Sequence, residues 1–392
     1  MKVTIIHPRL YEIGGAEKLM VDLSIEFASK GYTVQVITLQ CHDFWRERLS
    51  TYREKISIIE TSPSTLSYPR TFWLRALDNA KKMSRVINRS SELIIASGFP
   101  SSISALITSK CKDSVVLTYL HDAPPVLHDN DAWKRLPLRL RLSYSLMSRI
   151  YGNIDKEYVK NSDVIATNSL FSAKVNARVY EIEQGRIKII YPGINPREYT
   201  RLNNASCMVF LKEIKRKGKE IIFAPKGASL WRRPETLIAA LTKVRNVFCI
   251  FTYDNESERR KVNALARKAG VSERVICLPK LVGVPLKKIY SESSIVISLS
   301  IRESFGLTPL ESLMNGVPVI ISKTSGVSEV LEDRIHALHS DPDDHEMLAS
   351  QIEELLTNKQ LREEIVCKGQ ERILKDFTIQ RFAISLLKEA FT

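Results

Sequence analysis

Two glutamates that stand eight residues apart, Glu303 and Glu311, are the first residues in this sequence whose types and spacing could do chemistry. The apolar run at 295–300 predicts a buried strand that ends just before Glu303. Open α/β sheets bind ligands at the carboxyl ends of their strands, so Glu303 could accept hydrogen bonds from a ligand's hydroxyls, and Glu311 from a ribose. In the alternative interpretation, Glu303 is an ordinary solvated loop charge, and Glu311 closes a capping box with Thr308 as the N-cap.

A loop, a helix start and a second strand must position these glutamates. Gly306 marks a flexible loop. Thr308 and Pro309 mark the entry to a short helix, and Gly316 marks its end. The apolar run at 318–322 predicts the next strand, so strand, loop, helix and strand follow in close succession.

Residues 303–311, followed by residues 315–320, resemble the E-x7-E signature of the retaining glycosyltransferases of family 4 (glycosyl transferases group 1), which have the GT-B fold. The interior Phe-Gly-Leu and the trailing Gly-Val-Pro-Val-Ile make this resemblance specific. In that family the first Glu binds hydroxyls of the donor sugar and the second binds the nucleotide ribose. The backbone amides between them meet the diphosphate.

A pair of glycines marks a second candidate site. Gly14 and Gly15 follow the apolar run at 3–8 and open a predicted helix. Glycine lets a backbone approach a phosphate, and the N–H groups of a helix start attract anions. The family carries a Gly-Gly at this turn, facing the diphosphate of the donor or the acceptor. A tight turn without a ligand is the alternative.

A histidine, His121, ends the predicted strand at 115–120. A satisfied structural histidine is one interpretation. The family places a histidine at the corresponding strand end, near the reacting face of the sugar. The resemblance therefore implies that His121 hydrogen-bonds a sugar hydroxyl or the leaving-group side, and that His121 and Glu303 are the catalytic residues.

Two cations, Lys226 and Arg232, stand near the start of the predicted second domain. In the family this site normally reads Gly-Arg followed by Lys-Gly, and the Arg and Lys clamp the diphosphate. Here Pro225 replaces the glycine, Lys226 the arginine, and Arg232 or Arg233 the lysine. The charges are kept, but a planar fork and a point cation bind phosphate differently. The donor-binding residues that the resemblance implies are Gly14, Gly15, Lys226, Arg232, Lys280, Leu281, Glu303, Ser304, Phe305, Gly306, Leu307 and Glu311.

The domain organisation follows from the alternation of short apolar runs with stretches long enough for helices, which predicts parallel α/β sheets. The length of 392 residues favours two domains. The resemblance implies two Rossmann-like, doubly wound domains. We expect an acceptor-binding domain at 1–198, a nucleotide-sugar-binding domain at 199–376, and a C-terminal helix at 377–392 that returns to the N-terminal domain.

The net charge of +14 predicts attraction to polyanions, namely nucleic acid, an anionic membrane face or phosphorylated substrates. No apolar run reaches the length of a membrane helix and the N-terminus enters a strand at once, so we expect a cytoplasmic protein. Residues 133–151 combine apolar and basic residues. They are read either as a helix that covers the sheet or as an interfacial helix on an anionic membrane.

A metal cofactor is not expected. The six cysteines are scattered and predict neither disulfides nor a zinc site. Two D-x-D sequences, at 129–131 and 341–343, are typical of metal binding in the other major glycosyltransferase fold. We interpret the first as a polar loop, and the run at 341–344 that contains the second as a helix N-cap with acidic first-turn residues.

These observations predict a retaining glycosyltransferase that moves a sugar from a nucleotide-diphosphate donor to an acceptor. The acceptor could be lipid-linked or a growing glycan. The alternatives are a nucleotide-sugar epimerase or a phosphorylase on the same fold, or a non-enzymatic, basic nucleic-acid-binding protein.

Overall fold

The computed structural model describes residues 1–62, 75–109, 114–121, 128, 145–146, 148–199 and 209–392. Internal contacts divide the chain into two compact units. Met1–Gly193 and Ile379–Thr392 form the first, here called the N unit, and Ile194–Thr378 form the second, the C unit. Each unit contains one fully parallel sheet, which confirms the predicted fold class.

The N unit is built on a seven-stranded sheet with the strand order β3-β2-β1-β4-β5-β6-β7. Its strands are short apolar runs, because a parallel sheet is covered on both faces. The strands are β1 (Lys2–Ile6), β2 (Thr33–Thr38), β3 (Ile56–Glu60), β4 (Leu93–Ser97), β5 (Val115–Leu120), β6 (Val164–Thr167) and β7 (Ile187–Ile189).

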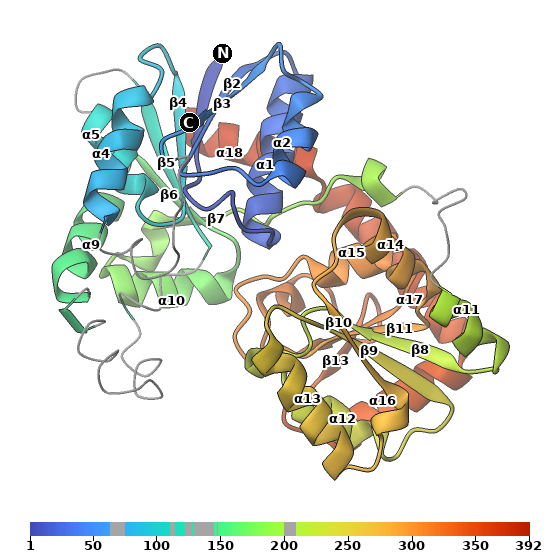
Figure 1. The fold of residues 1–392 in the computed structure, drawn as a ribbon. Coiled ribbons are helices and arrows are strands. Elements are labelled where there is room, and N and C mark those ends of the chain that lie inside the picture. The colour runs from blue at the N-terminus through green and yellow to red at the C-terminus, as the bar shows by residue number, and fades with distance from the viewer. Residues whose placement is uncertain (63–74, 110–113, 122–127, 129–144, 147, 200–208) are drawn as a thin grey trace. The chain divides into compact units, whose positions relative to one another are not determined.

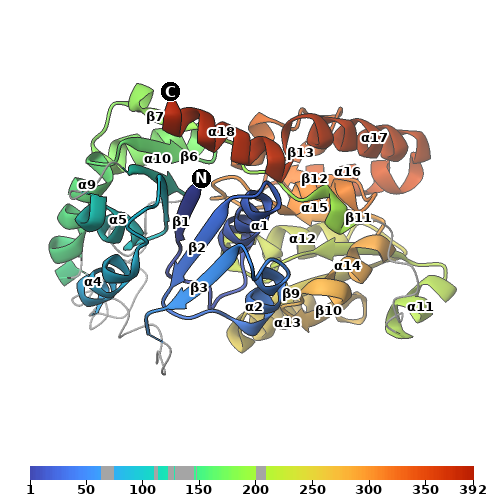
Figure 2. The same cartoon turned by 90° about the horizontal axis from the view of Figure 1, so that it is seen from above.

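Helices cover both faces of this sheet (Figures 1 and 2). Along β1, Val3 and Ile5 pack toward α1, while Ile6 packs toward α4 and α5, because successive side chains of a strand point to opposite faces. One face carries α1 (Gly15–Ser29), α2 (Asp43–Ser50) and α18 (Ile379–Phe391). The other carries α4 (Ala76–Val86), α5 (Ser101–Ser109), α9 (Asn153–Lys160) and α10 (Leu170–Tyr180). A π-helical turn, Ser148–Gly152, precedes α9, and a 3-10 turn, Gln184–Arg186, precedes β7.

The C-terminal helix α18 belongs to the N unit, which confirms the predicted return of the chain. Phe382 and Leu386 are buried against the sheet, and the Phe382 ring lies 5.2 Å from the ring of Tyr119. Ile384 and Phe391, also on the predicted apolar pattern, are 59% and 54% exposed. The buried face of α18 is therefore narrower than the pattern indicates.

The C unit is built on a six-stranded sheet with the order β10-β9-β8-β11-β12-β13. Its last strand, β13, was not predicted, because three residues that include His339 and Ser340 form no apolar run. The strands are β8 (Glu220–Ala224), β9 (Val247–Tyr253), β10 (Val275–Pro279), β11 (Ile295–Ser298), β12 (Val319–Ser322) and β13 (Leu338–Ser340).

Helices also cover both faces of the second sheet (Figure 1). One face carries α12 (Pro234–Leu241), α13 (Glu256–Lys268) and α16 (His345–Thr357). The other carries α11 (Val209–Arg216), α14 (Gly283–Glu292), α15 (Thr308–Met314) and α17 (Lys359–Asp376). Short 3-10 turns lie at Pro196–Tyr199, Leu230–Arg232, Ser272–Arg274 and Gly326–Glu329. No helix in the described part of the chain is both long and apolar enough to cross a membrane.

The strand order reverses direction once in each sheet, between β1 and β4 in the N unit and between β8 and β11 in the C unit. Open α/β sheets bind ligands outside the carboxyl ends of their strands at such a switch point. His7 directly follows β1, and Ser97 ends β4. Lys226 follows β8, and Glu303 lies in the loop after β11. Polar side chains thus stand at both switch points.

Candidate functional site

The C unit brings Arg232 and Glu303 into direct contact at its switch point. Arg232 Nη2 lies 2.5 Å from Glu303 Oε2, and Arg232 Nη1 donates a hydrogen bond to Ser298 Oγ at 2.9 Å. The two side chains are 13% and 21% exposed, so this ion pair is screened little by water. A cation suited to phosphate and a carboxylate suited to hydroxyls therefore stand side by side.

The neighbouring Arg233 is directed elsewhere. Its Nη2 lies 2.6 Å from Asp343 Oδ1, and its Nη1 donates to Glu235 Oε1 at 3.1 Å. Its φ of +50° lies in the left-handed region, which glycine adopts more readily. Of the two arginines left open by the sequence, Arg232 is the one beside Glu303.

The loop after Glu303 is held in place by its backbone. Gly326 N–H donates to the carbonyl oxygen of Glu303, and Val327 N–H donates to that of Phe305, both at 3.0 Å. Gly306 has a φ of +94°, and a Cβ built there would stand 3.0 Å from Glu303 Cγ. Glycine therefore lets this loop turn directly beside the carboxylate. Ser304 and Leu307 belong to the same loop.

The capping box predicted for Thr308 and Glu311 is wrong. Helix α15 begins at Thr308 itself, its N-cap is Leu307, and no side chain caps it. The Glu311 carboxylate instead accepts hydrogen bonds from the hydroxyls of Tyr199 at 3.4 Å and Tyr290 at 3.3 Å. The hydroxyls of Tyr199 and Tyr290 thus take the place of the backbone N–H that a capping box would direct to the Glu311 carboxylate.

Burial, and then the charge of Glu311, raises the pKa of Tyr290 well above its usual value, so the Tyr290 phenol stays protonated as a donor. The structure therefore holds the Glu311 carboxylate between two phenols, where it can still accept from a further hydroxyl. Its predicted contact with a ribose stays a prediction.

Lys226 adds a second cation at the end of β8. It has a φ of +53°, and its backbone N–H donates to Thr252 Oγ1 at 2.7 Å. Burial, with repulsion by Lys280 second, lowers the pKa of Lys226. Lys280, at the end of β10 beside Leu281, lies 3.3 Å from Asp254 Oδ1. An anionic ligand would relieve the unfavourable surroundings of Lys226.

Among the described residues, no group of three or more His, Cys, Asp or Glu side chains is arranged so that it could hold a metal ion. The D-x-D at 129–131 lies outside the described residues. In the other, Asp341 lies 2.7 Å from Lys323 Nζ. The following Asp344 caps α16 by accepting from the N–H groups of Glu346 and Met347, which confirms the predicted N-cap.

The N unit places His121 at the end of a row of four hydrogen-bonded side chains, here called the His121 row. His121 Nε2 lies 2.9 Å from Ser97 Oγ, and Ser97 Oγ lies 3.1 Å from His7 Nδ1. His7 Nε2 lies 3.3 Å from Glu17 Oε1. The row therefore links the ends of β5, β4 and β1 to the first turn of α1.

The glycine pair has a structural purpose of its own. Gly14 is the N-cap of α1, and a Cβ built on it would stand 2.3 Å from Glu17 Oε2. Burial works to raise the pKa of Glu17, but hydrogen bonding and charge from His7 and its own backbone N–H lower it to about 2. An ionised carboxylate of the chain thus lies over the helix start. The donor-binding roles of Gly14 and Gly15 stay predictions.

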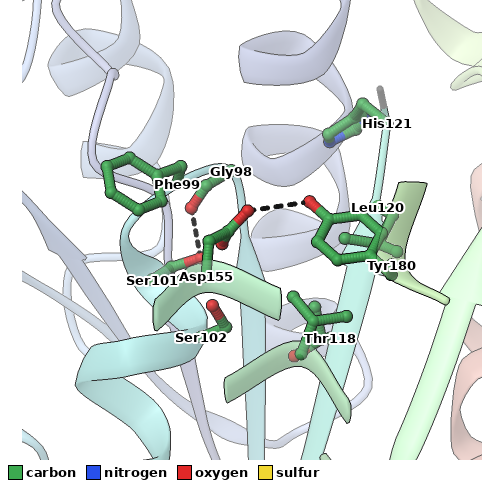
Figure 3. A pocket seen from close by; sticks show the side chains of 10 residues that line it. Gly98, Phe99, Ser101, Ser102, Thr118, Leu120, His121, Asp155 and Tyr180 are labelled. Carbon is green, nitrogen blue, oxygen red and sulfur yellow. Dashed lines mark hydrogen bonds between the residues drawn. The ribbon is translucent and has the colours of Figure 1, made fainter. Parts of the chain in front are cut away.

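A cavity of about 40 Å³ lies at the carboxyl ends of β4 and β5 (Figure 3). His121, Thr118 and Ser102 line it, and Asp155 closes it from α9. Asp155 Oδ2 accepts from Tyr180 OH at 3.0 Å, as the dashed line in Figure 3 shows, and lies 3.0 Å from His128 Nε2. This space fits ordered water rather than a sugar ring.

Sequence reasoning did not select His7, Ser97 or Glu17 as site residues. A signal was present for the first two, because each is a polar residue at the carboxyl end of an apolar strand, as His121 is. Tyr199 and Tyr290 carry no such signal, since each lies in a helical segment far from Glu311 in the sequence.

Family models match both halves of the chain. A model described as Glycosyltransferase Family 4 matches residues 13–198, and one described as Glycosyl transferases group 1 matches residues 210–372. The first match includes Gly14, Gly15 and every member of the His121 row except His7, and the second includes Arg232, Glu303 and Glu311.

Curated relatives match more distantly. An uncharacterized glycosyltransferase of Methanocaldococcus jannaschii is 24% identical over 209 residues, which cover 52% of this chain and 54% of that protein. A D-inositol 3-phosphate glycosyltransferase of Salinispora tropica is 23% identical over 257 residues, covering 61% and 52%. The chain therefore spans about half the length of these relatives.

Solved structures share the fold over the whole chain. The crystal structure of Anabaena HepE in complex with UDP and glucose has a TM-score of 0.75 and 17% sequence identity. The match covers 99% of this chain and 98% of HepE. At this identity the likeness shows a common GT-B fold.

Proposed function

Because the chain belongs to the family 4 (group 1) glycosyltransferases, we propose that it moves a sugar from a nucleotide-diphosphate donor to an acceptor, with retention at the anomeric carbon. The observation that carries this proposal is the contact between Arg232 and Glu303 at the switch point of the C unit. A nucleotide sugar has both groups that this pair suits, since its diphosphate attracts the guanidinium and its sugar hydroxyls donate to the carboxylate.

The donor enters by exchanging partners with this ion pair. A diphosphate oxygen replaces Glu303 on Arg232, since guanidinium binds phosphate as well as carboxylate in a forked geometry. Glu303, released from Arg232, accepts hydrogen bonds from the sugar. Lys226 and the backbone amides of Phe305, Gly306 and Leu307 take up the remaining phosphate charge.

Transfer then requires the leaving diphosphate to gain negative charge while the sugar gains oxocarbenium character. The cations stabilise the first change, because they are fixed in place before it occurs. Glu303 and His121 orient the sugar through its hydroxyls. Burial, with repulsion by His7 second, lowers the pKa of His121 to about 3, so this histidine is neutral and suits hydrogen bonding rather than acid catalysis.

A thermal-shift panel of nucleotides and nucleotide sugars tests donor binding. UDP-glucose is the first probe, because HepE has been solved with UDP and with UDP-glucose. A ligand at 100 times its Kd should add about 2.7 kcal/mol of stability. Glu311→Gln should weaken this effect for every nucleotide through the ribose, and Glu273→Gln, an exposed glutamate in the same unit, should not. Stabilisation by nucleic acid alone would contradict the proposal.

Removal of divalent metal should leave transfer intact. Lys226 and Arg232 already supply two positive charges for the diphosphate, so no ion is needed to neutralise the leaving group. The measurement is the initial transfer rate before and after EDTA, with the chelator's effect on donor binding as a control. A rate that falls on chelation and returns with magnesium or manganese would show that the site needs a metal.

The acceptor is proposed to be presented at an anionic membrane surface. Residues 133–144 and 147 lie outside the described residues, but the adjoining Leu146 and Ile150 are 54% and 42% exposed. Apolar residues exposed beside a basic segment suit an interface with anionic lipid, where each nearby cation contributes about 1 kcal/mol.

Cosedimentation with vesicles that contain anionic lipid tests this placement. Binding should weaken with salt, and it should be lost when Arg135, Arg139 and Arg141 are all replaced by Glu. The matched control replaces three cations elsewhere in the N unit, Lys55, Arg89 and Lys174, which are all exposed. Equal recovery of wild type and the first variant in the supernatant would favour a soluble acceptor. A phosphorylated polyol would then be the next candidate, as the name of the Salinispora tropica relative suggests.

A further inference from the structure

The His121 row is a continuous series of hydrogen bonds that ends on the proposed sugar-contacting histidine. Its three inner members are buried, with exposed fractions of 7% for Glu17, 3% for His7 and 0% for Ser97. His121 itself, just after β5, is in a less buried class than these three residues. The row therefore leads from a buried carboxylate to the proposed sugar-contacting histidine.

We propose that Glu17, His7 and Ser97 are positioning residues that hold the His121 ring in one orientation and one tautomer, so that its Nδ1 meets a sugar hydroxyl in one fixed hydrogen-bonding role. This inference rests on the proposed function, because it takes the sugar donor as the ligand of His121. The inference assigns three further residues to sugar transfer, and none of them contacts the reacting atoms.

The directions of the hydrogen bonds are coupled along the row. The ionised Glu17 carboxylate can only accept, so His7 carries a proton on Nε2. Ser97 has one hydroxyl hydrogen, so it donates to one of the two histidine rings and accepts from the other. When Ser97 donates to His7 Nδ1, the proton of a neutral His121 lies on Nε2 and its Nδ1 is the acceptor. When His7 also carries a proton on Nδ1, Ser97 donates to His121 Nε2 and Nδ1 of His121 is the donor. In each case the row admits one tautomer of His121.

Local backbone geometry supports the same arrangement. Gly98, directly after Ser97, has a φ of +76°, a conformation that glycine adopts without strain, and this turns the chain away from the strand end. Gly14 leaves the space into which Glu17 Oε2 folds. The His7 and His121 rings are perpendicular at 6.4 Å, with Ser97 bonded to both. The orientation of the Glu17 side chain and that of the His121 ring, at the two ends of the row, are thus both fixed.

The test combines ring nitrogen NMR with kinetics on the full chain. Histidine labelled with ¹⁵N reports which ring nitrogen carries the proton, and His121→Gln assigns the signal. In ligand-free wild type, His121 should show a single tautomer. Its proton should lie on Nε2 if the His7 signals show one protonated nitrogen, and on Nδ1 if they show two. Ser97→Ala should give a mixture of both tautomers. Ser104→Ala, another fully buried serine of the N unit, should leave the wild-type pattern.

Kinetics with UDP-glucose give the second readout. Ser97→Ala and Glu17→Gln should lower kcat about tenfold with little change in KM, the loss expected for one hydrogen bond. A mixture of both His121 tautomers in wild type, or an unchanged tautomer in Ser97→Ala, would overturn the inference even if Glu17→Gln does not fold. A tautomer change in Ser97→Ala, with no turnover of any nucleotide sugar by wild type, would instead refute the proposed function and leave the positioning row standing.

Discussion

Replacing Glu303 with Gln is expected to lower kcat for sugar transfer by about 10² to 10³, while the affinity for UDP changes little. Glutamine keeps the size of the side chain but loses the charge that strengthens hydrogen bonds from the sugar hydroxyls. The diphosphate and ribose are held by other residues, so nucleotide binding should persist. The measurements are kcat with UDP-glucose and the Kd of UDP.

The control for this variant is Glu273→Gln, which removes one exposed carboxylate from the same unit. It should retain the wild-type kcat and Kd. Turnover at the wild-type rate by Glu303→Gln would remove Glu303 from the site. A large loss of UDP affinity in that variant would instead assign Glu303 to the nucleotide.

Replacing Arg232 with Gln is expected to weaken UDP binding about 10- to 100-fold, the cost of hydrogen bonds to a charged group. The variant removes the cation that faces both Glu303 and the proposed diphosphate. Arg232→Lys should fall between wild type and Arg232→Gln, because lysine keeps the charge but loses the planar fork. Isothermal titration with UDP measures all three proteins.

The adjacent Arg233→Gln variant supplies the matched control for this second prediction. Arg233 contacts Asp343 and Glu235, so its loss should leave UDP affinity unchanged. Equal losses in the Arg232 and Arg233 variants would show that general positive charge, and not the placement of Arg232, governs binding.

Much of the fold could be predicted because buried parallel strands are continuous apolar runs. β11 and β12 are typical, and the glycine pair at the start of α1 marks a helix start in the sequence itself. The E-x7-E resemblance also identified Glu303 and Glu311 as a pair. β13 escaped prediction because only one of its three residues, Leu338, is apolar, so it forms no apolar run.

The contacts within the candidate site could not be predicted, because they join residues far apart in the sequence. Arg232 meets Glu303 only because β8 and β11 are neighbours in the sheet. Glu311 leaves its expected cap because Tyr199 and Tyr290 reach it from other segments. Local spacing specifies helix starts and strand ends, and the sheet order then decides which side chains meet.

The most direct test of the central claim is the release of UDP from UDP-glucose together with the movement of labelled glucose to an acceptor. The assay uses three conditions, namely no acceptor, D-inositol 3-phosphate, and vesicles of anionic lipid extract from the producing cells. We expect UDP release to depend on one acceptor, to equal the glucose found in the product, and to fall in Glu303→Gln. Conversion of UDP-glucose without UDP release, or the absence of turnover of any nucleotide sugar alongside salt-sensitive nucleic-acid binding, would contradict the proposed sugar transfer.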